Sequence, residues 1–72
     1  MKETGYFFNS HTYFPSDLIL TEGEYSYFDG YDEGNRKAVL VFCSGNFVCA
    51  SPMKKNENVA EKISRVKERL AA

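Results

Sequence analysis

The sequence has no tryptophan, two cysteines, two prolines and one histidine, and these shortages exclude several classes of protein. Two cysteines are too few for the disulfide framework of a small secreted domain. The longest apolar run, residues 38–43, is six residues long, whereas a membrane-spanning helix needs about 18. The first residues also lack the charged and then apolar pattern of a signal peptide. We therefore expect a cytoplasmic protein without a membrane segment.

Groups that carry chemistry are scarce as well. His11 is the only imidazole, no Cys-x-x-Cys pair is present, and a structural zinc site usually has four ligands. Asp29, Asp32 and Glu33 surround a turn but lack the alternating ligand spacing of a calcium loop. The glycines are scattered and do not form a phosphate-binding motif. We therefore expect no enzymatic activity, no cofactor and no metal site, with His11 at a turn or on the surface.

What the sequence does contain is sorted by position. Nine of its eleven aromatic residues fall within residues 1–31. Residues 1–35 have seven acidic side chains and one lysine, a net charge of −6, whereas residues 36–72 have eight cations and three acids, a net charge of +5. With 72 residues, 43% of them hydrophobic, the chain can form the core of one small domain, residues 1–72. The charge asymmetry bears on partners rather than on fold.

Alternation, turn residues and apolar runs predict strands over 24–31, 36–43 and 47–51. Because residues 38–43 are apolar without alternation, we expect the middle strand to be buried on both faces. Residues 5–14 also favour extended structure, with a turn at Asn9 and Ser10, whereas 17–20 fit either a helical turn or a short strand. A hairpin turn over 44–46 does not place Cys43 opposite Cys49, so we expect two reduced, buried thiols.

The last third of the chain predicts one amphipathic helix. Its apolar positions step by four, three and four residues, which places them on one stripe: Val59, Ile63, Val66 and Leu70. Asn58, with Glu61 three residues later, is a candidate N-cap, and Asn56 is the competing one. Strands followed by one helix indicate an α+β domain: a small antiparallel sheet of three to four strands with the C-terminal helix on one face.

The sequence favours a non-enzymatic binding protein, a regulator or inhibitor of a protein partner, and a homodimer remains open. Tyr25, Tyr27 and Asp29 share one face of the strand at 24–31. Since an acid should not be buried unpaired, we interpret this face as exposed and expect Tyr27→Ala to change folding by less than about 1 kcal/mol. Tyrosine suits interfaces, and the acids suit a basic partner surface. The predicted protein-binding residues are Tyr25, Tyr27, Asp29, Tyr31 and Asp32.

The alternative is nucleic-acid binding through the basic half. Its candidate residues precede the helix or share one helical face: Lys54, Lys55, Lys62, Arg65 and Arg69. A competing interpretation is an ordinary solvated face, since Glu61 can pair with Arg65. The order of three antiparallel strands and a helix resembles that of the arm-binding domains of tyrosine recombinases, which implies DNA binding. In those domains the sheet presents cations, whereas acids crowd the strand at 24–31 here, so DNA contacts are expected from the helix.

Overall fold

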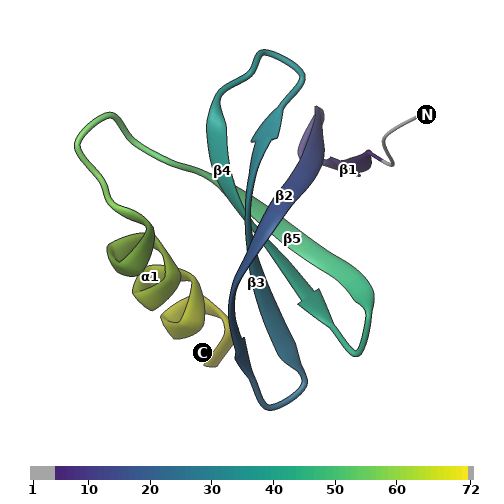
Figure 1. Ribbon diagram of the computed structural model, residues 1–72, viewed down its shortest axis with the longest axis vertical. Helices are drawn as coiled ribbons and strands as arrows, with labels where there is room; N and C mark the ends of the chain where they lie inside the picture. The colour runs from purple at the N-terminus through teal and green to yellow at the C-terminus, as the bar shows by residue number, and fades with distance from the viewer. Residues whose placement is uncertain (1–4, 72) are drawn as a thin grey trace.

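The computed structural model describes residues 5–71, which form an antiparallel sheet with one helix beside it (Figure 1). The strands lie in the sheet in chain order and are followed by the helix: β1 (Tyr6–Phe8), β2 (His11–Glu22), β3 (Tyr25–Asp32), β4 (Lys37–Cys43), β5 (Asn46–Pro52) and α1 (Val59–Ala71). The expected α+β class is confirmed, but the sheet has five strands rather than three to four. The extra strand comes from residues 5–22, whose mixed pattern left their pairing open.

Two-residue turns set the register of three hairpins. Asn9 and Ser10, with φ of 52° and 69°, join β1 to β2, as the composition predicts. Ser44 and Gly45, with φ of 51° and 83°, join β4 to β5 and place Cys43 opposite Asn46. A bulge then places Cys49 opposite Val41, so the two cysteines do not face each other and both are free. Both thiols are half-buried rather than fully buried.

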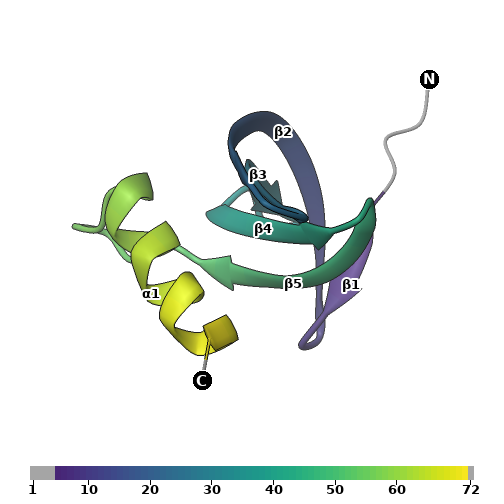
Figure 2. The same ribbon diagram turned by 90° about the horizontal axis from the view of Figure 1, so that it is seen from below.

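The sheet is strongly curved and encloses one core on its inner face. Its two outer strands approach each other, and the ring of Tyr6 in β1 stacks on Phe47 in β5 at 5.1 Å (Figure 2). Leu40 and Ala38 point from β4 into this space, where Tyr13 of β2 is also buried. Curvature therefore buries aromatic side chains that a flat sheet of this size would leave in water.

The second core lies between the outer face of the sheet and α1. The predicted helical stripe faces this core, and Ile63 and Val66 are its fully buried members. Val39 and Val41 point from β4 toward the helix, while their neighbours point into the inner core. This arrangement confirms that β4 is buried on both faces, the physical reason for its unbroken apolar run. The amide of Glu61 donates to Oδ1 of Asn58 at 2.8 Å, so Asn58 is the cap.

Strand β2 forms an irregular edge beyond its short pairing with β1. Strand β1 pairs only with residues 11–13 of β2, and no other strand within residues 5–71 covers the remainder of that edge. Register shifts at Ser16 and Ile19 interrupt the pairing of β2 with β3. Bulges and proline at an edge discourage strand-to-strand association, and Pro15 lies in the same segment. Across the described residues, no helix is both long and apolar enough to cross a membrane.

Candidate functional site

The face of β3 that the sequence predicts to be exposed is the face covered by α1. Tyr27 is only 2% exposed and belongs to the helix-facing core, and Tyr25 packs against that core. Nζ of Lys67 lies 5.7 Å from the centre of the Tyr27 ring and forms an ion pair with Glu22 at 3.0 Å. Burial raises the pKa of Tyr27 above 10.0. The prediction that Tyr27 is an exposed contact is therefore wrong.

Asp29, the acid that prompted that prediction, shares the face but lies farther along β3. It is half-buried, and it lies directly opposite Asp17 of β2. Like charges directly opposite each other destabilise a sheet, and neither acid has an ion pair within residues 5–71. Oδ1 of Asp29 is buried without any hydrogen-bond donor in the described part of the chain. The two acids therefore form a site at which a positive charge or a hydrogen-bond donor would be stabilising.

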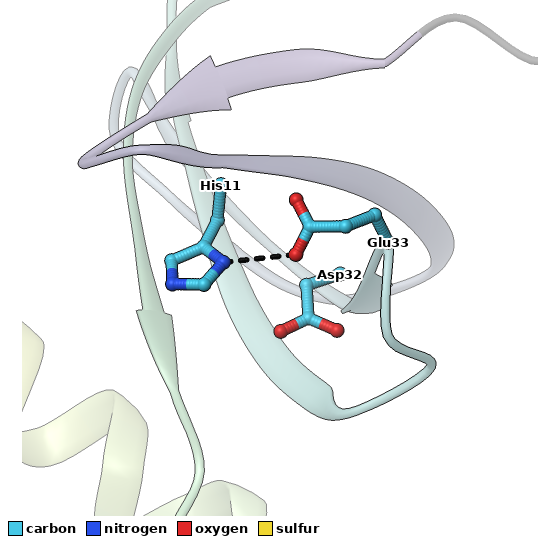
Figure 3. Close-up of side chains that lie close together, drawn as sticks. All are labelled: His11, Asp32 and Glu33. Atoms are coloured by element: carbon cyan, nitrogen blue, oxygen red, sulfur yellow. Dashed lines mark hydrogen bonds and ion pairs between the residues drawn. The ribbon is translucent and has the colours of Figure 1, made fainter.

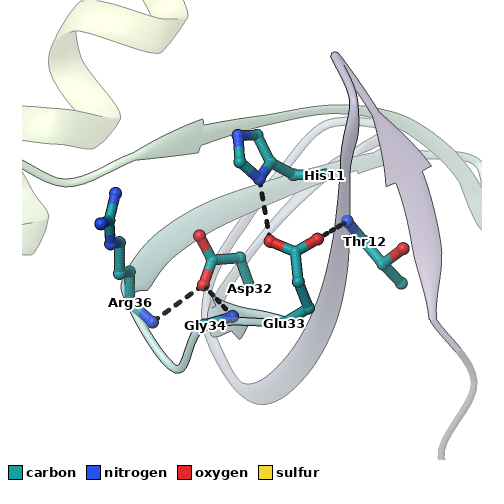
Figure 4. Close-up of polar contacts among 6 residues, drawn as sticks. All are labelled: His11, Thr12, Asp32, Glu33, Gly34 and Arg36. Carbon is teal, nitrogen blue, oxygen red and sulfur yellow. Dashed lines mark hydrogen bonds and ion pairs between the residues drawn. The ribbon is translucent and has the colours of Figure 1, made fainter.

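The other two predicted protein-binding residues, Tyr31 and Asp32, also pack against neighbouring parts of the fold. Tyr31 is half-buried, and its ring stacks on Phe14 at 5.6 Å. Asp32 is only 5% exposed, which contradicts its predicted place on an open surface. Its Oδ1 accepts backbone hydrogen bonds from Gly34 at 2.8 Å and Arg36 at 2.9 Å (Figure 4). Asp32 therefore holds the β3–β4 turn, as short polar side chains commonly do.

An apolar groove that the sequence did not reveal runs between β2 and α1. It has a volume of about 540 Å³ and is lined by one aliphatic pair from β2 and one flank of the helix: Ile19, Leu20, Val59, Ala60, Ile63, Ser64 and Lys67. Ile19 is 38% exposed, and the preceding Leu18 is 56% exposed. A bulge at Ile19 interrupts the pairing of β2 with β3 beside this groove. The available signal was the apolar run 18–20, whose period fits either a helical turn or a short strand.

The predicted basic surface is divided by one buried carboxylate. Glu57 forms an ion pair with Lys62 at 3.4 Å, and Arg65 Nη1 lies 3.0 Å from its Oε2, a charge contact without hydrogen-bond geometry. A hydrogen bond from the Lys54 amide is the main reason why the pKa of Glu57 lies below 4.5. Lys62 is only 7% exposed, so it cannot belong to the open cationic face that we predicted. Helical periodicity predicts that Lys62 lies on that face, but the loop before α1 covers its side chain.

The other predicted cations remain accessible. Lys54, Lys55 and Arg65 line a shallow hollow of about 400 Å³, together with Asn56, Glu57 and Glu61. Arg69 is exposed near the end of α1 and does not line this hollow. Two carboxylates among the lining side chains reduce the positive potential that a phosphate would meet. The hollow is therefore a weaker anion site than the number of cations in the sequence suggests.

A polar cluster gathers at the opposite end of β3, near the start of β2 (Figure 3). Nδ1 of His11 lies 2.8 Å from Oε2 of Glu33, and the amide of Thr12 donates to Oε1 of the same carboxylate at 2.7 Å. His11 is exposed, as predicted. The Thr12 amide, followed by His11, lowers the pKa of Glu33 below 4.5, and the Arg36 amide is the main cause that lowers the pKa of Asp32. Both carboxyl groups are therefore ionised at neutral pH.

No protein-family model, curated protein or solved structure matches this chain. Function must therefore be argued from the groove, the acid pair and the charged clusters of the chain itself.

Proposed function

We propose that this chain is a small non-enzymatic binding protein that holds a segment of a protein partner in the groove between β2 and α1. The observation that carries this proposal is the apolar groove itself, in whose lining Ile19 is 38% exposed, next to Leu18, its 56% exposed neighbour in the chain. Isolated exposed aliphatic residues are ordinary, but an exposed isoleucine in the lining of an apolar groove gives a partner a surface on which to bury apolar area. The role remains that of a regulator or inhibitor acting through contact.

Charge complementarity supports a basic partner. The facing acids Asp17 and Asp29 lie on the same sheet face as Tyr27, which α1 covers. Neither acid forms an ion pair within residues 5–71. A lysine or arginine of the partner would relieve their mutual repulsion and supply the donor that Oδ1 of Asp29 lacks. The proposed occupant is thus a protein segment with aliphatic side chains for the groove and a neighbouring cation for the acids.

The chemistry of the chain supports a binding role over catalysis. Burial raises the pKa of the Cys49 thiol above 9.0, which disfavours the nucleophilic thiolate. The two free cysteines also favour the cytoplasm as the proposed location. A second candidate is nucleic-acid binding at the hollow lined by Lys54, Lys55 and Arg65, which the exposure of these cations favours.

The test is selection of peptides from a random library against the wild-type protein, followed by affinity measurements on the selected peptides. We expect peptides that combine aliphatic residues with lysine or arginine. Ile19→Ser should weaken binding by about 30-fold or more, the size expected of an interface hot spot. Asp17→Asn should weaken it less and should reduce its salt dependence.

Val48→Ser is the matched control, because Val48 and Ile19 are both 38% exposed but Val48 lies on β5, away from the groove. Equal losses from Val48→Ser and Ile19→Ser would contradict the groove as the docking site. If nucleic acid is the ligand, the groove variants bind it normally, whereas joint replacement of Lys54, Lys55 and Arg65 weakens binding and reduces the salt dependence of what remains.

A further inference from the structure

One imidazole nitrogen and two carboxylate oxygens converge beside the β3–β4 turn. The atoms come from His11, Asp32 and Glu33, and they lie within 4.8 Å of one another (Figure 3). We propose that these three side chains bind a divalent transition-metal ion, with zinc as the best match. Zinc accepts both imidazole nitrogen and carboxylate oxygen, and it binds such sites more tightly than manganese or iron does. The proposed site is separate from the groove and does not depend on it.

Backbone donors already orient both carboxylates. Oδ1 of Asp32 accepts hydrogen bonds from the amides of Gly34 and Arg36, and Oε1 of Glu33 accepts one from Thr12 (Figure 4). These contacts use one oxygen of each carboxylate and direct the other toward the cluster. Outer partners of this kind commonly fix the ligands of metal sites and strengthen binding. The arrangement is therefore partly organised for a metal before any ion binds.

Asp32 is the least exposed of the three proposed ligands. Its side chain is buried, at 5% exposure, and its Oδ1 accepts the two backbone hydrogen bonds of the turn. In Figure 4 its other carboxylate oxygen points toward the His11 side of the cluster. A metal ion between Asp32 and His11 would bind this second oxygen.

The rearrangement needed for zinc is small. Ligand atoms of a tetrahedral zinc lie about 3.4 Å apart, given metal–ligand bonds of about 2.0–2.1 Å. The His11–Glu33 contact of 2.8 Å must open slightly, and the widest separation of 4.8 Å must close. Both side chains are 49% exposed and can rotate, whereas Asp32 is held by the turn. A water molecule would complete the four-coordinate shell.

The proposed ion would also compete with protons. Coordination uses neutral imidazole, so protons compete with zinc for His11, and zinc affinity should be lower at pH 5.5 than at pH 7.5. The carboxylates remain ionised in this range because their pKa values are lowered. A bound ion would join the start of β2 to the turn after β3, two segments about twenty residues apart in the sequence, and should raise the melting temperature.

The test is titration of tag-free protein with zinc chloride at pH 7.5, followed by calorimetry and by NMR of the histidine ring. His11 is the only histidine, so its ring signals report this site alone. We expect one zinc per chain, a shift of both ring nitrogens and weaker binding at pH 5.5. His11→Ala and Glu33→Gln should each weaken binding by at least about 10- to 100-fold, the loss that removal of an outer-shell partner alone causes. Magnesium at the same concentration should leave the ring signals unchanged.

Two controls separate this site from other zinc ligands. Glu68→Gln removes an exposed helical acid outside the cluster and should leave zinc affinity unchanged. The double variant Cys43→Ala/Cys49→Ala should also bind normally, because thiols are the competing zinc ligands of the chain. Ring signals that do not respond to zinc, binding that survives His11→Ala, or binding lost with the cysteines would each overturn the proposal.

Discussion

The two halves of one face of β3 have opposite environments. In the first half Tyr27 lies under α1, with almost no exposure, whereas in the second half Asp29 faces Asp17 without an ion-pairing partner in residues 5–71. Strand alternation correctly places Tyr27 and Asp29 on the same face. Alternation gives no information on how much of that face a helix covers. The presence of an acid on a strand face therefore argues only for the solvation of that acid, not of its neighbours.

The largest expected effect comes from the covered half. Tyr27→Ala should destabilise the protein by about 3–5 kcal/mol, because it leaves a cavity under the helix. This value replaces the small change that an exposed tyrosine would predict. Urea unfolding followed by circular dichroism measures the difference. Tyr27→Phe keeps the ring and serves as the control; a loss below about 1 kcal/mol for Tyr27→Ala would show that α1 does not pack on Tyr27.

Two isoleucines provide a matched comparison between the covered face and the open groove. Ile63 is 6% exposed in the helical stripe, and Ile19 is 38% exposed at the groove rim. Ile63→Ala should cost about 2–5 kcal/mol, whereas Ile19→Ala should cost less than about 1 kcal/mol, as surface substitutions do. Thermal and urea unfolding of both variants under one buffer condition test this ordering. Similar losses would mean that Ile19 is part of the core rather than of a binding surface.

Lowering the pH should destabilise the contacts of the loop before α1 more than those of the uncovered part of β3 around Asp29. The pKa of Glu57 in the folded protein is lowered from 4.5, chiefly by the Lys54 amide, so its contacts stabilise the fold above that pH. This contribution is lost as pH falls through the lower folded value. Stability should therefore decline below about pH 4.5, together with contributions from Asp32 and Glu33.

Glu57→Gln should flatten that decline, and stability measured by urea unfolding between pH 3 and 7 provides the test. Glu68→Gln, an exposed change on the same helix, should leave the slope unaltered. An unchanged acid slope in Glu57→Gln would show that the ion contacts of Glu57 with Lys62 and Arg65 do not stabilise the fold.

The smallest expected effect lies in the uncovered half. Asp29→Asn preserves the size of the side chain and removes its repulsion with Asp17, so it should stabilise the isolated protein by about 0.2–1 kcal/mol. The same change should weaken binding of a basic partner segment, which gives opposite signs for stability and affinity. Unfolding and peptide-affinity measurements on one preparation check both. Destabilisation by Asp29→Asn would instead indicate that the carboxylate is satisfied within the folded chain.

Much of the fold was predictable because local chemistry determines it. The apolar run of β4, the stripe of α1, the cap at Asn58 and the turn at Asn9 and Ser10 all appear where the sequence places them. The bulges at Ser16 and Ile19 could not be read in this way, since they have no local signature and depend on how β2 bends across β3. The groove and the exposure of Leu18 follow from that bend.

The candidate sites depended on contacts between distant segments. The sequence identified Asp29 and Asp32 as notable acids, but only the folded chain shows that Asp29 lacks a donor and that Asp32 holds a turn. Charge pattern placed Lys62 on an open face, whereas the loop that carries Glu57 covers it. His11 could be recognised as the sole imidazole, yet its approach to Glu33 depends on the pairing of β2 with β3.

By itself, the sequence determined the class of fold, the two-sided burial of β4 and the amphipathic helix, because periodicity and turn chemistry act over a few residues. The tertiary structure alone decided which face of the sheet α1 covers, how the curvature joins β1 to β5, and which polar groups meet. These features depend on strand register and on the competition between two apolar faces for one helix. Such competition is settled by the total area buried across the whole chain, which no local pattern records.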